Sequence, residues 1–178
     1  MRRFFEVIDL KSKIRSIPDF PEKGIIFRDI TTLLKDAEGL QQSIAQMHQK
    51  IMDLEYDVVL GPESRGFLFG MPIAYHEEKG FVPVRKKGKL PAETISKEYA
   101  LEYGTATIEI HKDALKKGQK VVIVDDLLAT GGTAKAIVEM VEQMGAEVVA
   151  LDFLIELEGL KGREVLKGYR VESVIKYE

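Results

Sequence analysis

The stretch that decides the fold reads Val121-Val122-Ile123-Val124-Asp125-Asp126-Leu127-Leu128-Ala129-Thr130-Gly131-Gly132-Thr133. It opens as a run of β-branched residues, typical of a buried strand, and the run ends in two carboxylates. A loop of small residues follows, and a helical pattern begins at Ala134. Glycines let backbone N–H groups approach a phosphate closely, and the positive end of the next helix dipole attracts it further. With two acids placed to meet sugar hydroxyls, the stretch predicts a site for a phosphorylated ribose.

The bulk properties of the chain narrow the classes of partner. Its 178 residues suit one domain, spanning residues 1–178. The net charge of −3 provides no positive field, so we expect no nucleic-acid partner. The chain has no cysteine, which excludes disulfides and thiolate metal sites and fits a reducing compartment. No apolar run is long enough to cross a bilayer, so we expect a cytoplasmic protein with no membrane partner.

Apolar strands alternate with helices along the chain. This alternation predicts an α/β fold with a mostly parallel central sheet flanked by helices. Strands are expected at Ile25–Ile30, Asp57–Leu60, Phe81–Arg85, Lys120–Val124, Glu147–Ile155 and Val171–Tyr177, with an antiparallel pair at Thr94–Tyr103 and Thr105–His111. Helices are expected at Phe4–Ile14, Gly39–Leu54 with Asp36 as its cap, Arg65–Glu78, Ala134–Met144 and Leu160–Leu166.

Two segments follow buried strands directly, Gly61–Gly66 and Asp125–Thr133. In open α/β sheets, ligands bind beyond the carboxyl ends of the strands. We therefore expect these two segments to face one cleft.

The residues alone leave other interpretations of the acid pair open. Asp125 and Asp126 would also fit an ordinary solvated strand end, a phosphoacceptor or a Mg²⁺ cluster. The loop after them contains no lysine and lacks the spacing of a nucleotide P-loop, and no Gly-x-Gly-x-x-Gly dinucleotide fingerprint is present. His48, His76 and His111 have no metal-ligand spacing, which favours surface or helix-face positions for all three.

The stretch from Val121 to Thr133 resembles the phosphoribosyl-pyrophosphate (PRPP) signature of the type I phosphoribosyltransferases. That resemblance implies their fold, a parallel sheet with a small hood or flap region. It implies that Asp125 and Asp126 hold the ribose 2- and 3-hydroxyls. It also implies a 5-phosphate site formed by Ala129, Thr130, Gly131, Gly132 and Thr133.

Five further segments, in order along the chain, resemble adenine phosphoribosyltransferases. They are Phe20-Pro21 to Phe27-Arg28-Asp29-Ile30, Ser64-Arg65-Gly66-Phe67, Arg85-Lys86-Lys87-Gly88-Lys89-Leu90-Pro91, Leu101-Glu102-Tyr103-Gly104 and Leu160-Lys161-Gly162-Arg163-Glu164. The resemblance implies purine salvage, in which adenine and PRPP give AMP and pyrophosphate. It also implies a homodimer, and Mg²⁺ that arrives with PRPP and has no direct protein ligand. The alternatives are another phosphoribosyltransferase, acting on hypoxanthine, guanine, xanthine or orotate, or a PRPP-sensing regulator without catalysis.

The same resemblance assigns roles to individual residues. Glu102 would exchange a proton with nitrogen 7 of the purine, from a flexible flap at about residues 86–104 that also carries Tyr103. Arg65, Asp125 and Asp126 complete the catalytic set. The pyrophosphate contacts would be Glu63, Ser64, Arg65, Arg85, Lys86 and Lys89, although a basic run such as 85–89 also fits a solvated loop. The adenine contacts would be Ile26, Phe27 and Arg28, in a base-binding segment of about residues 1–35, together with Leu127.

Overall fold

The computed structural model of the chain describes residues 8–100 and 104–178. The chain divides into two compact units, Met1–Gln46 and Met47–Glu178. The organisation expected from the sequence, one domain with an N-terminal base-binding segment and a flap, stays a prediction. No helix in the described residues is long and apolar enough to cross a membrane.

The first unit is built around a short hairpin. Strands β1 (Arg15–Pro18) and β2 (Ile26–Asp29) pair antiparallel, with Ile17 opposite Phe27. The Arg15 guanidinium donates to the Asp29 carboxylate, which also accepts from the backbone N–H of Thr31 at 2.9 Å. These hydrogen bonds fasten the end of the hairpin to helix α1 (Thr31–Leu34).

The expected N-terminal helix, residues 4–14, is wrong where the structure describes it. Residues 10–13 form a 3₁₀ turn, η1 (Leu10–Lys13), whose N-cap Asp9 accepts from the backbone N–H of Lys11. Backbone hydrogen bonds from the N–H of Ser12 to Asp9 and from the N–H of Ile14 to Lys11 close three-residue turns here in place of α-helical ones. The chain is extended only from Arg15, where β1 pairs with β2. The cap at Asp36 is confirmed: its Oδ1 accepts from the N–H of Gly39 at 2.7 Å, at the start of helix α2 (Ala37–Ile51).

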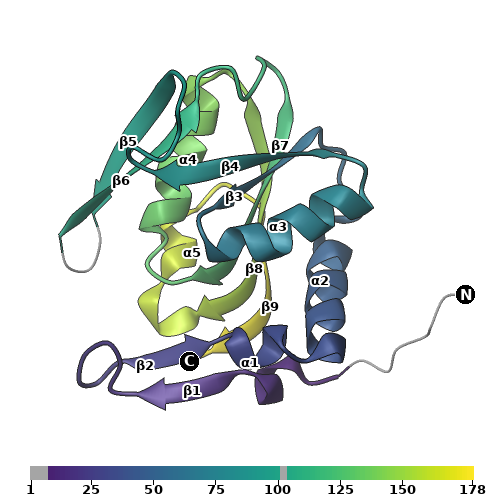
Figure 1. The fold of residues 1–178 in the computed structure, drawn as a ribbon, viewed down its shortest axis with the longest axis vertical. Coiled ribbons are helices and arrows are strands. Elements are labelled where there is room, and N and C mark those ends of the chain that lie inside the picture. The colour runs from purple at the N-terminus through teal and green to yellow at the C-terminus, as the bar shows by residue number, and fades with distance from the viewer. Residues whose placement is uncertain (1–7, 101–103) are drawn as a thin grey trace, which may run out of the picture. The chain divides into compact units, whose positions relative to one another are not determined.

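The second unit holds a seven-stranded sheet in the order β5-β6-β4-β3-β7-β8-β9 (Figure 1). Strands β3, β4, β7, β8 and β9 run parallel, whereas β6 pairs antiparallel with both β4 and β5. This confirms the expected fold class. The strands are β3 (Val58–Pro62), β4 (Gly80–Lys86), β5 (Thr94–Ala100), β6 (Thr105–His111), β7 (Lys120–Leu128), β8 (Glu147–Leu157) and β9 (Val171–Tyr177).

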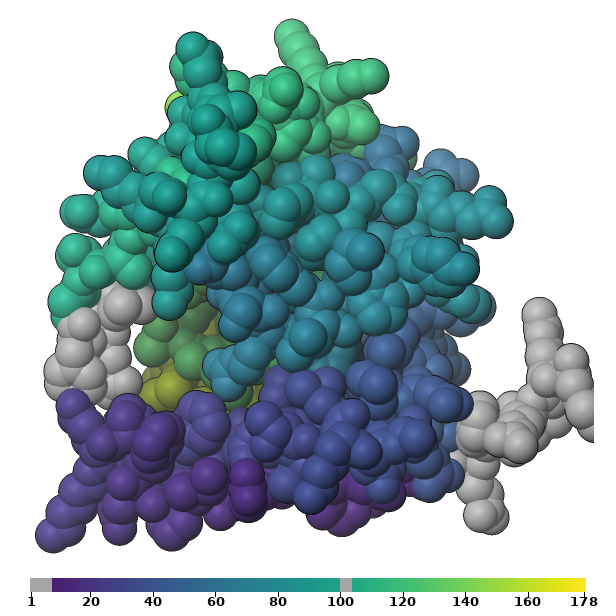
Figure 2. All heavy atoms as spheres, viewed as in Figure 1, coloured from purple at the N-terminus to yellow at the C-terminus, as the bar shows by residue number. Residues whose placement is uncertain are grey.

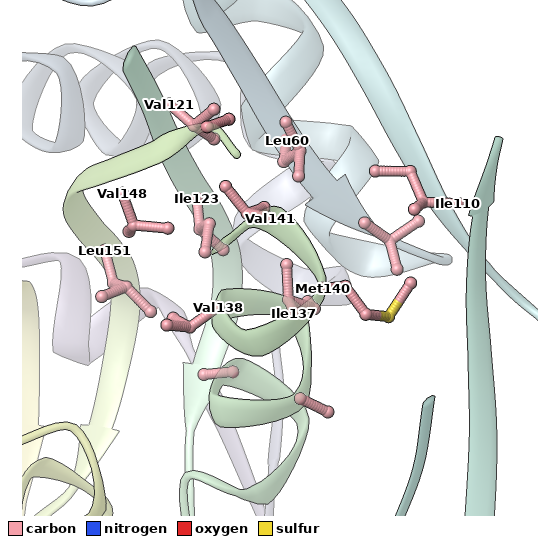
Figure 3. Packing of buried hydrophobic residues seen from close by; sticks show 14 of the residues in the cluster. Leu60, Ile110, Val121, Ile123, Ile137, Val138, Met140, Val141, Val148 and Leu151 are labelled. Carbon is pink, nitrogen blue, oxygen red and sulfur yellow. The ribbon is translucent and has the colours of Figure 1, made fainter. Parts of the chain in front are cut away.

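Helices cover both faces of this sheet, which is why its central strands are apolar on both sides. Helix α4 (Gly132–Gln143) packs Ile137, Val138 and Val141 against strand residues that include Ile123 and Leu151, as Figure 3 shows. Helix α3 (Arg65–His76) contacts β3, β4 and β7. The short elements η2 (Glu158–Leu160) and α5 (Gly162–Val165) connect β8 to β9.

Candidate active site

One pocket of the second unit lies beyond the carboxyl ends of β3 and β7. Both strand-end segments contribute to it, as expected from the sequence, and α4 begins at its edge. Its lining residues are Pro62, Glu63, Ser64, Arg65, Tyr99, Asp125, Asp126, Leu127, Leu128, Ala129, Thr130, Gly131, Gly132, Thr133, Ala134 and Phe153. The pocket therefore brings together the two aspartates of β7, Glu63, an arginine and the start of a helix.

The two acids lie inside β7 rather than after it, because the strand continues to Leu128. Asp125 Oδ1 accepts a hydrogen bond from the backbone N–H of Asp126 at 2.8 Å. Burial raises the pKa of Asp125 well above its ordinary value, and the charge of Asp126 raises it further. Burial also raises the pKa of Asp126, while the nearby Arg65 guanidinium opposes that rise. The two carboxylates are thus poorly solvated, and a hydroxyl donor or a positive charge beside them would stabilise their ionised forms.

Arg65 reaches this pair from the neighbouring strand end. Its Nε lies 3.0 Å from Asp126 Oδ2. The turn that carries it contains a cis peptide bond between Glu63 and Ser64, and α3 begins at Arg65 itself. Gly66 leaves room for this approach, since a Cβ there would lie 2.7 Å from Pro62 and 3.0 Å from Asp125 Oδ1. The expected meeting of the two strand ends is confirmed in this contact.

The loop after the acids leads directly into a helix N-terminus. Gly131 has φ = +82° and is the N-cap of α4, which begins at Gly132, two residues before the predicted start. The first turn contains no acidic residue, and no side chain of the described residues caps it. The first N–H groups of a helix have no partner within the helix. Because the start of α4 lines the pocket, these donors are available to an anion there. This loop and helix start, Ala129–Thr133, form what we call the phosphate cradle.

The backbone of the phosphate cradle packs closely against the backbone of Gly162. A Cβ on Gly131 would lie 2.7 Å from the carbonyl oxygen of Gly162, and one on Gly162 would lie 2.2 Å from the carbonyl oxygen of Ala129. Real side chains do not reach such distances, so only glycine fits at either position. The segment around Gly162 thus supports the cradle from α5 without lining the pocket.

The cationic residues expected for pyrophosphate are only partly at the pocket. Arg85 donates to the Glu63 carboxylate through its Nε. Burial alone would raise the pKa of Glu63, but hydrogen bonds from Arg85 and the Lys86 backbone hold that pKa below its ordinary value. Lys86 and Lys89 do not line the pocket in the part of the chain that the structure describes.

The loop after β4 has an anchor that the sequence did not reveal. The buried Glu109 on β6 accepts from the backbone N–H groups of Lys89 and Leu90 at 3.1 and 3.0 Å. Burial opposes its charge, yet these backbone hydrogen bonds hold the pKa of Glu109 below its ordinary value. The start of the expected flap is therefore held by a buried carboxylate.

The expected base-binding residues lie on β2 in the first unit. Phe27 contacts Phe20 edge to face with ring centroids 5.2 Å apart, and Ile26 is exposed. Arg28 donates from Nη1 to the Ser16 hydroxyl at 2.5 Å. Leu127 belongs to the second unit and lines the pocket.

Glu102 and Tyr103 fall in residues 101–103, outside the described residues. Their expected roles stay predictions.

Two aromatic residues of the pocket were not predicted from the sequence, Tyr99 and Phe153. Phe153 pairs in register with Asp125 on the adjacent strand, so its ring lies beside the carboxylate and contributes to its desolvation. Both are aromatic residues within alternating strands, a pattern that signals a strand but does not show which face meets a ligand. The signal that could have found Phe153 is the β7–β8 register, which a single sequence does not contain.

Comparison with known proteins gives consistent results. Residues 29–175 match the model of the phosphoribosyl transferase domain. The adenine phosphoribosyltransferase of Lachnoclostridium phytofermentans is 65% identical over 168 residues, which cover 94% of this chain and 97% of that protein. A crystal structure of the enzyme from Thermoanaerobacter pseudethanolicus is similar with a TM-score of 0.92 and 56% identity, covering 94% of this chain and 98% of the other. The Saccharomyces cerevisiae enzyme, crystallised with an imino-altritol bisphosphate and adenine, has a TM-score of 0.85 and 41% identity, with 91% and 94% coverage.

The pocket and these similarities define a phosphoribosyltransferase with a parallel-sheet fold. Within that class, the chain belongs to the adenine phosphoribosyltransferase family, a family of enzymes, as its sequence motifs predict.

Proposed function

We propose that the chain transfers the 5-phosphoribosyl group of PRPP to adenine, giving AMP and pyrophosphate. The observation that carries this proposal is the pocket in which the desolvated Asp125–Asp126 pair adjoins Arg65 and the N-terminus of α4. Family membership supports the choice of adenine, because the yeast relative was crystallised with adenine and a sugar bisphosphate analogue.

The phosphate cradle positions one end of PRPP. Backbone N–H groups of Ala129–Thr133 and the α4 dipole bind the 5-phosphate. Because Gly131 and Gly162 lie in direct backbone contact, the cradle is formed before the ligand arrives. Its contribution is therefore positioning of the ribose rather than proton transfer.

Asp125 and Asp126 bind the ribose 2- and 3-hydroxyls. As the bond from the anomeric carbon to pyrophosphate breaks, that carbon gains positive charge, as in glycoside cleavage. The carboxylates lie in a desolvated pocket where their attraction for such charge is strong. Without ligand, burial makes ionisation of the two carboxylates unfavourable, which is why their pKa values are raised. The developing positive charge favours the ionised forms and so lowers those pKa values.

The leaving pyrophosphate binds at the turn that carries Arg65. Glu63, Ser64 and Arg65 line the pocket there, and Arg85 is held beside it by Glu63. An entering pyrophosphate would compete with Glu63 for the Arg85 guanidinium, since both are anions. Lys86 and Lys89 would join only if the loop held by Glu109 moves toward the pocket.

Leu127 is the one lining residue of the described pocket that we assign to adenine. We assign Ile26, Phe27 and Arg28 on β2, with Leu127, to the base, since backbone groups can match the amine and ring nitrogen 1 of adenine and mismatch hypoxanthine. In the adenine tautomer that carries its proton on nitrogen 7, nitrogen 9 forms the new bond to the anomeric carbon as the bond to pyrophosphate breaks, and Glu102 takes the proton from nitrogen 7.

The donor set at the pocket also fits Mg²⁺ that arrives with PRPP. Mg²⁺ retains several waters, and the carboxylates of Glu63, Asp125 and Asp126 around the cavity would accept hydrogen bonds from those waters. When bound, the ion neutralises charge on the leaving pyrophosphate. We assign it no direct protein ligand.

A homodimer is the proposed assembly. Helix α3 exposes Leu68, Met71 and Tyr75, which recur at helical spacing along one stripe, and Tyr75 is 85% exposed. This face of the second unit is in view in Figure 2. Light scattering should give twice the chain mass of 20.0 kDa, and Met71→Glu should lower it. A wild-type mass equal to one chain would contradict the dimer.

We keep the cytoplasm as the proposed location. The chain has no cysteine, so its folding needs no oxidising compartment. PRPP and adenine, the proposed substrates, are small polar molecules that need no membrane surface for their recognition.

The test of the proposed function is a base panel. Purified protein with Mg²⁺ and PRPP is offered adenine, hypoxanthine, guanine, xanthine and orotate in turn, and pyrophosphate release is measured. We expect release with adenine at least about 100-fold faster than with any other base, because buried hydrogen-bond mismatches are expensive. Release with another base identifies a different transferase, and PRPP binding without any release identifies a sensor.

A further inference from the structure

Three metal-ligating side chains outside the pocket meet in the second unit. His48 lies in the last turn of α2, His76 is the last residue of α3 and Glu77 follows it. One ligand atom from each can be chosen so that all three lie within 4.8 Å of one another. No other group of three or more such side chains occurs among residues 8–100 and 104–178.

The contacts within this cluster are close but not those of an ordinary hydrogen-bonded pair. His48 Nε2 lies 2.5 Å from Glu77 Oε1. Nevertheless, Nε2 is buried and has no hydrogen-bond partner among the described residues. The rings of His48 and His76 meet edge to face with centroids 4.8 Å apart. Positive charge is stabilised beside a carboxylate and an unpartnered ring nitrogen.

The composition of the cluster selects a class of ion. Two imidazoles and one carboxylate are the ligands that Zn²⁺ and similar divalent transition metals bind, and three protein ligands leave a fourth tetrahedral position for water. Ligands about 2.0–2.1 Å from Zn²⁺ lie roughly 3.3 Å from one another in a tetrahedron. The separations of 2.5 and up to 4.8 Å bracket that value, so side-chain adjustments suffice.

The position of the cluster also favours a cation. Helices α2 and α3 have 15 and 12 residues, and both end here. The carbonyl end of a helix carries partial negative charge.

Other charged groups surround the site. Glu77 is close enough to Tyr56 to help raise the pKa of that phenol to about 12, after burial, which is the larger cause. Lys79 lies 5.9 Å from the centre of the Tyr56 ring and adds an opposing positive charge. The Tyr56 hydroxyl is buried without a hydrogen-bond partner in the described part of the chain.

We propose that His48, His76 and Glu77 form a binding site for a divalent transition-metal cation, with Zn²⁺ as the ion that fits the ligand set. The ion joins the last turn of α2 to the end of α3. The site is separate from the phosphate cradle and shares none of its residues.

The sequence did not indicate this site, because the two histidines lie 28 positions apart, at 48 and 76. Metal motifs are recognised in a sequence by short spacings between ligands. Here the packing of two helices replaces that spacing.

The test uses the full chain without a histidine tag, freed of metal by a chelator. Zn²⁺ is titrated near pH 7, where imidazole is mostly neutral, and binding is followed by calorimetry. We expect one Zn²⁺ per chain, and at least about tenfold weaker binding in His76→Ala, which removes one ligand. Because His76 is exposed, this variant should fold normally. Glu77→Gln should also weaken binding.

His111→Ala is the matched control, because His111 is the third histidine of the chain and lies at the end of β6, outside the cluster. It should bind Zn²⁺ as the wild type does. Co²⁺ should give the intense visible absorption of a tetrahedral site in the wild type and in His111→Ala, but not in His76→Ala. Equal binding by the two histidine variants, or no binding by the wild type, would falsify the proposal.

Discussion

Two acid–arginine pairs occupy neighbouring strands of the sheet, and they behave in opposite ways. At the end of β7, Asp126 pairs with Arg65, and at the end of β8, Glu156 pairs with Arg163. The two carboxylates are similarly buried, with side chains 6% and 5% exposed. Yet burial raises the pKa of Asp126, whereas the hydrogen bonds from Arg163 lower the pKa of Glu156.

The difference lies in how fully each carboxylate is hydrogen-bonded. Glu156 accepts two hydrogen bonds from Arg163, at 2.9 and 2.6 Å, and one from the Ser173 hydroxyl at 2.6 Å. Asp126 Oδ2 contacts Arg65 but accepts no hydrogen bond from the described residues, and a second acid precedes it. The β8 pair is satisfied by the protein, and the β7 pair retains capacity for a ligand.

The largest expected effect is on activity. Asp125→Asn should lower kcat/KM for AMP formation at least about 100-fold, because it removes charge from the desolvated site that we propose for the ribose. Steady-state pyrophosphate release measures this. Glu156→Gln is the matched control and should remain within about threefold of wild type. Equal losses of kcat/KM in the two variants would contradict the assignment of the β7 acids, and not Glu156, to the ligand site.

A smaller effect, on stability, should appear at the other pair. Glu156→Gln should lower the free energy of unfolding by about 1–2 kcal/mol at pH 7, since Arg163 loses its charged partner and is itself partly exposed. The folded-state pKa of Glu156 is lowered, so its contribution is present above its ordinary value of 4.5 and is lost as pH falls. Urea unfolding between pH 4 and 8 measures both. A loss independent of pH would contradict the ionic origin.

At the adjacent acids Asp125 and Asp126, removal of a charge should raise the free energy of unfolding, whereas Glu156→Gln lowers it. Asp125→Asn should raise the free energy of unfolding by about 1 kcal/mol at pH 7, since it relieves a buried like-charge pair and keeps an oxygen for the Asp126 N–H. The folded-state pKa of Asp125 is raised above 3.8, so the native acid is least unfavourable below that pH, and its penalty grows as pH rises. The stability gain of the variant should therefore shrink as pH falls. A destabilised variant at pH 7 would show that the charge pair is not frustrated.

The smallest effect concerns a single hydroxyl. Ser173→Ala should destabilise the chain by about 0.5–1 kcal/mol, because Glu156 keeps both hydrogen bonds from Arg163. Thermal unfolding would measure it, with no change in kcat/KM. A loss equal to that of Glu156→Gln would mean that the hydroxyl, not the guanidinium, stabilises the carboxylate.

The sequence predicted those parts of the molecule that depend on neighbouring residues. The β-branched run before Asp125 and the small residues before Ala134 identify a strand, a loop and a helix start in one stretch. Partners far apart in the chain were not predictable in this way. Glu109 beneath the Lys89 loop, Phe153 beside Asp125 and His48 beside His76 all depend on register and helix packing. The predicted N-terminal helix is wrong at residues 10–13, because a 3₁₀ turn capped by Asp9 forms there and apolar spacing does not distinguish the two.

The backbone contact between the cradle and Gly162 has an evolutionary consequence. A receptor made of main-chain atoms is inherited with the fold, and substitutions of side chains around it leave its shape unchanged. Divergence in substrate choice would then arise at the residues that we propose for the base, Ile26–Arg28 and Leu127. A lineage could thus exchange one nucleobase for another while the two glycines keep the shape of the cradle.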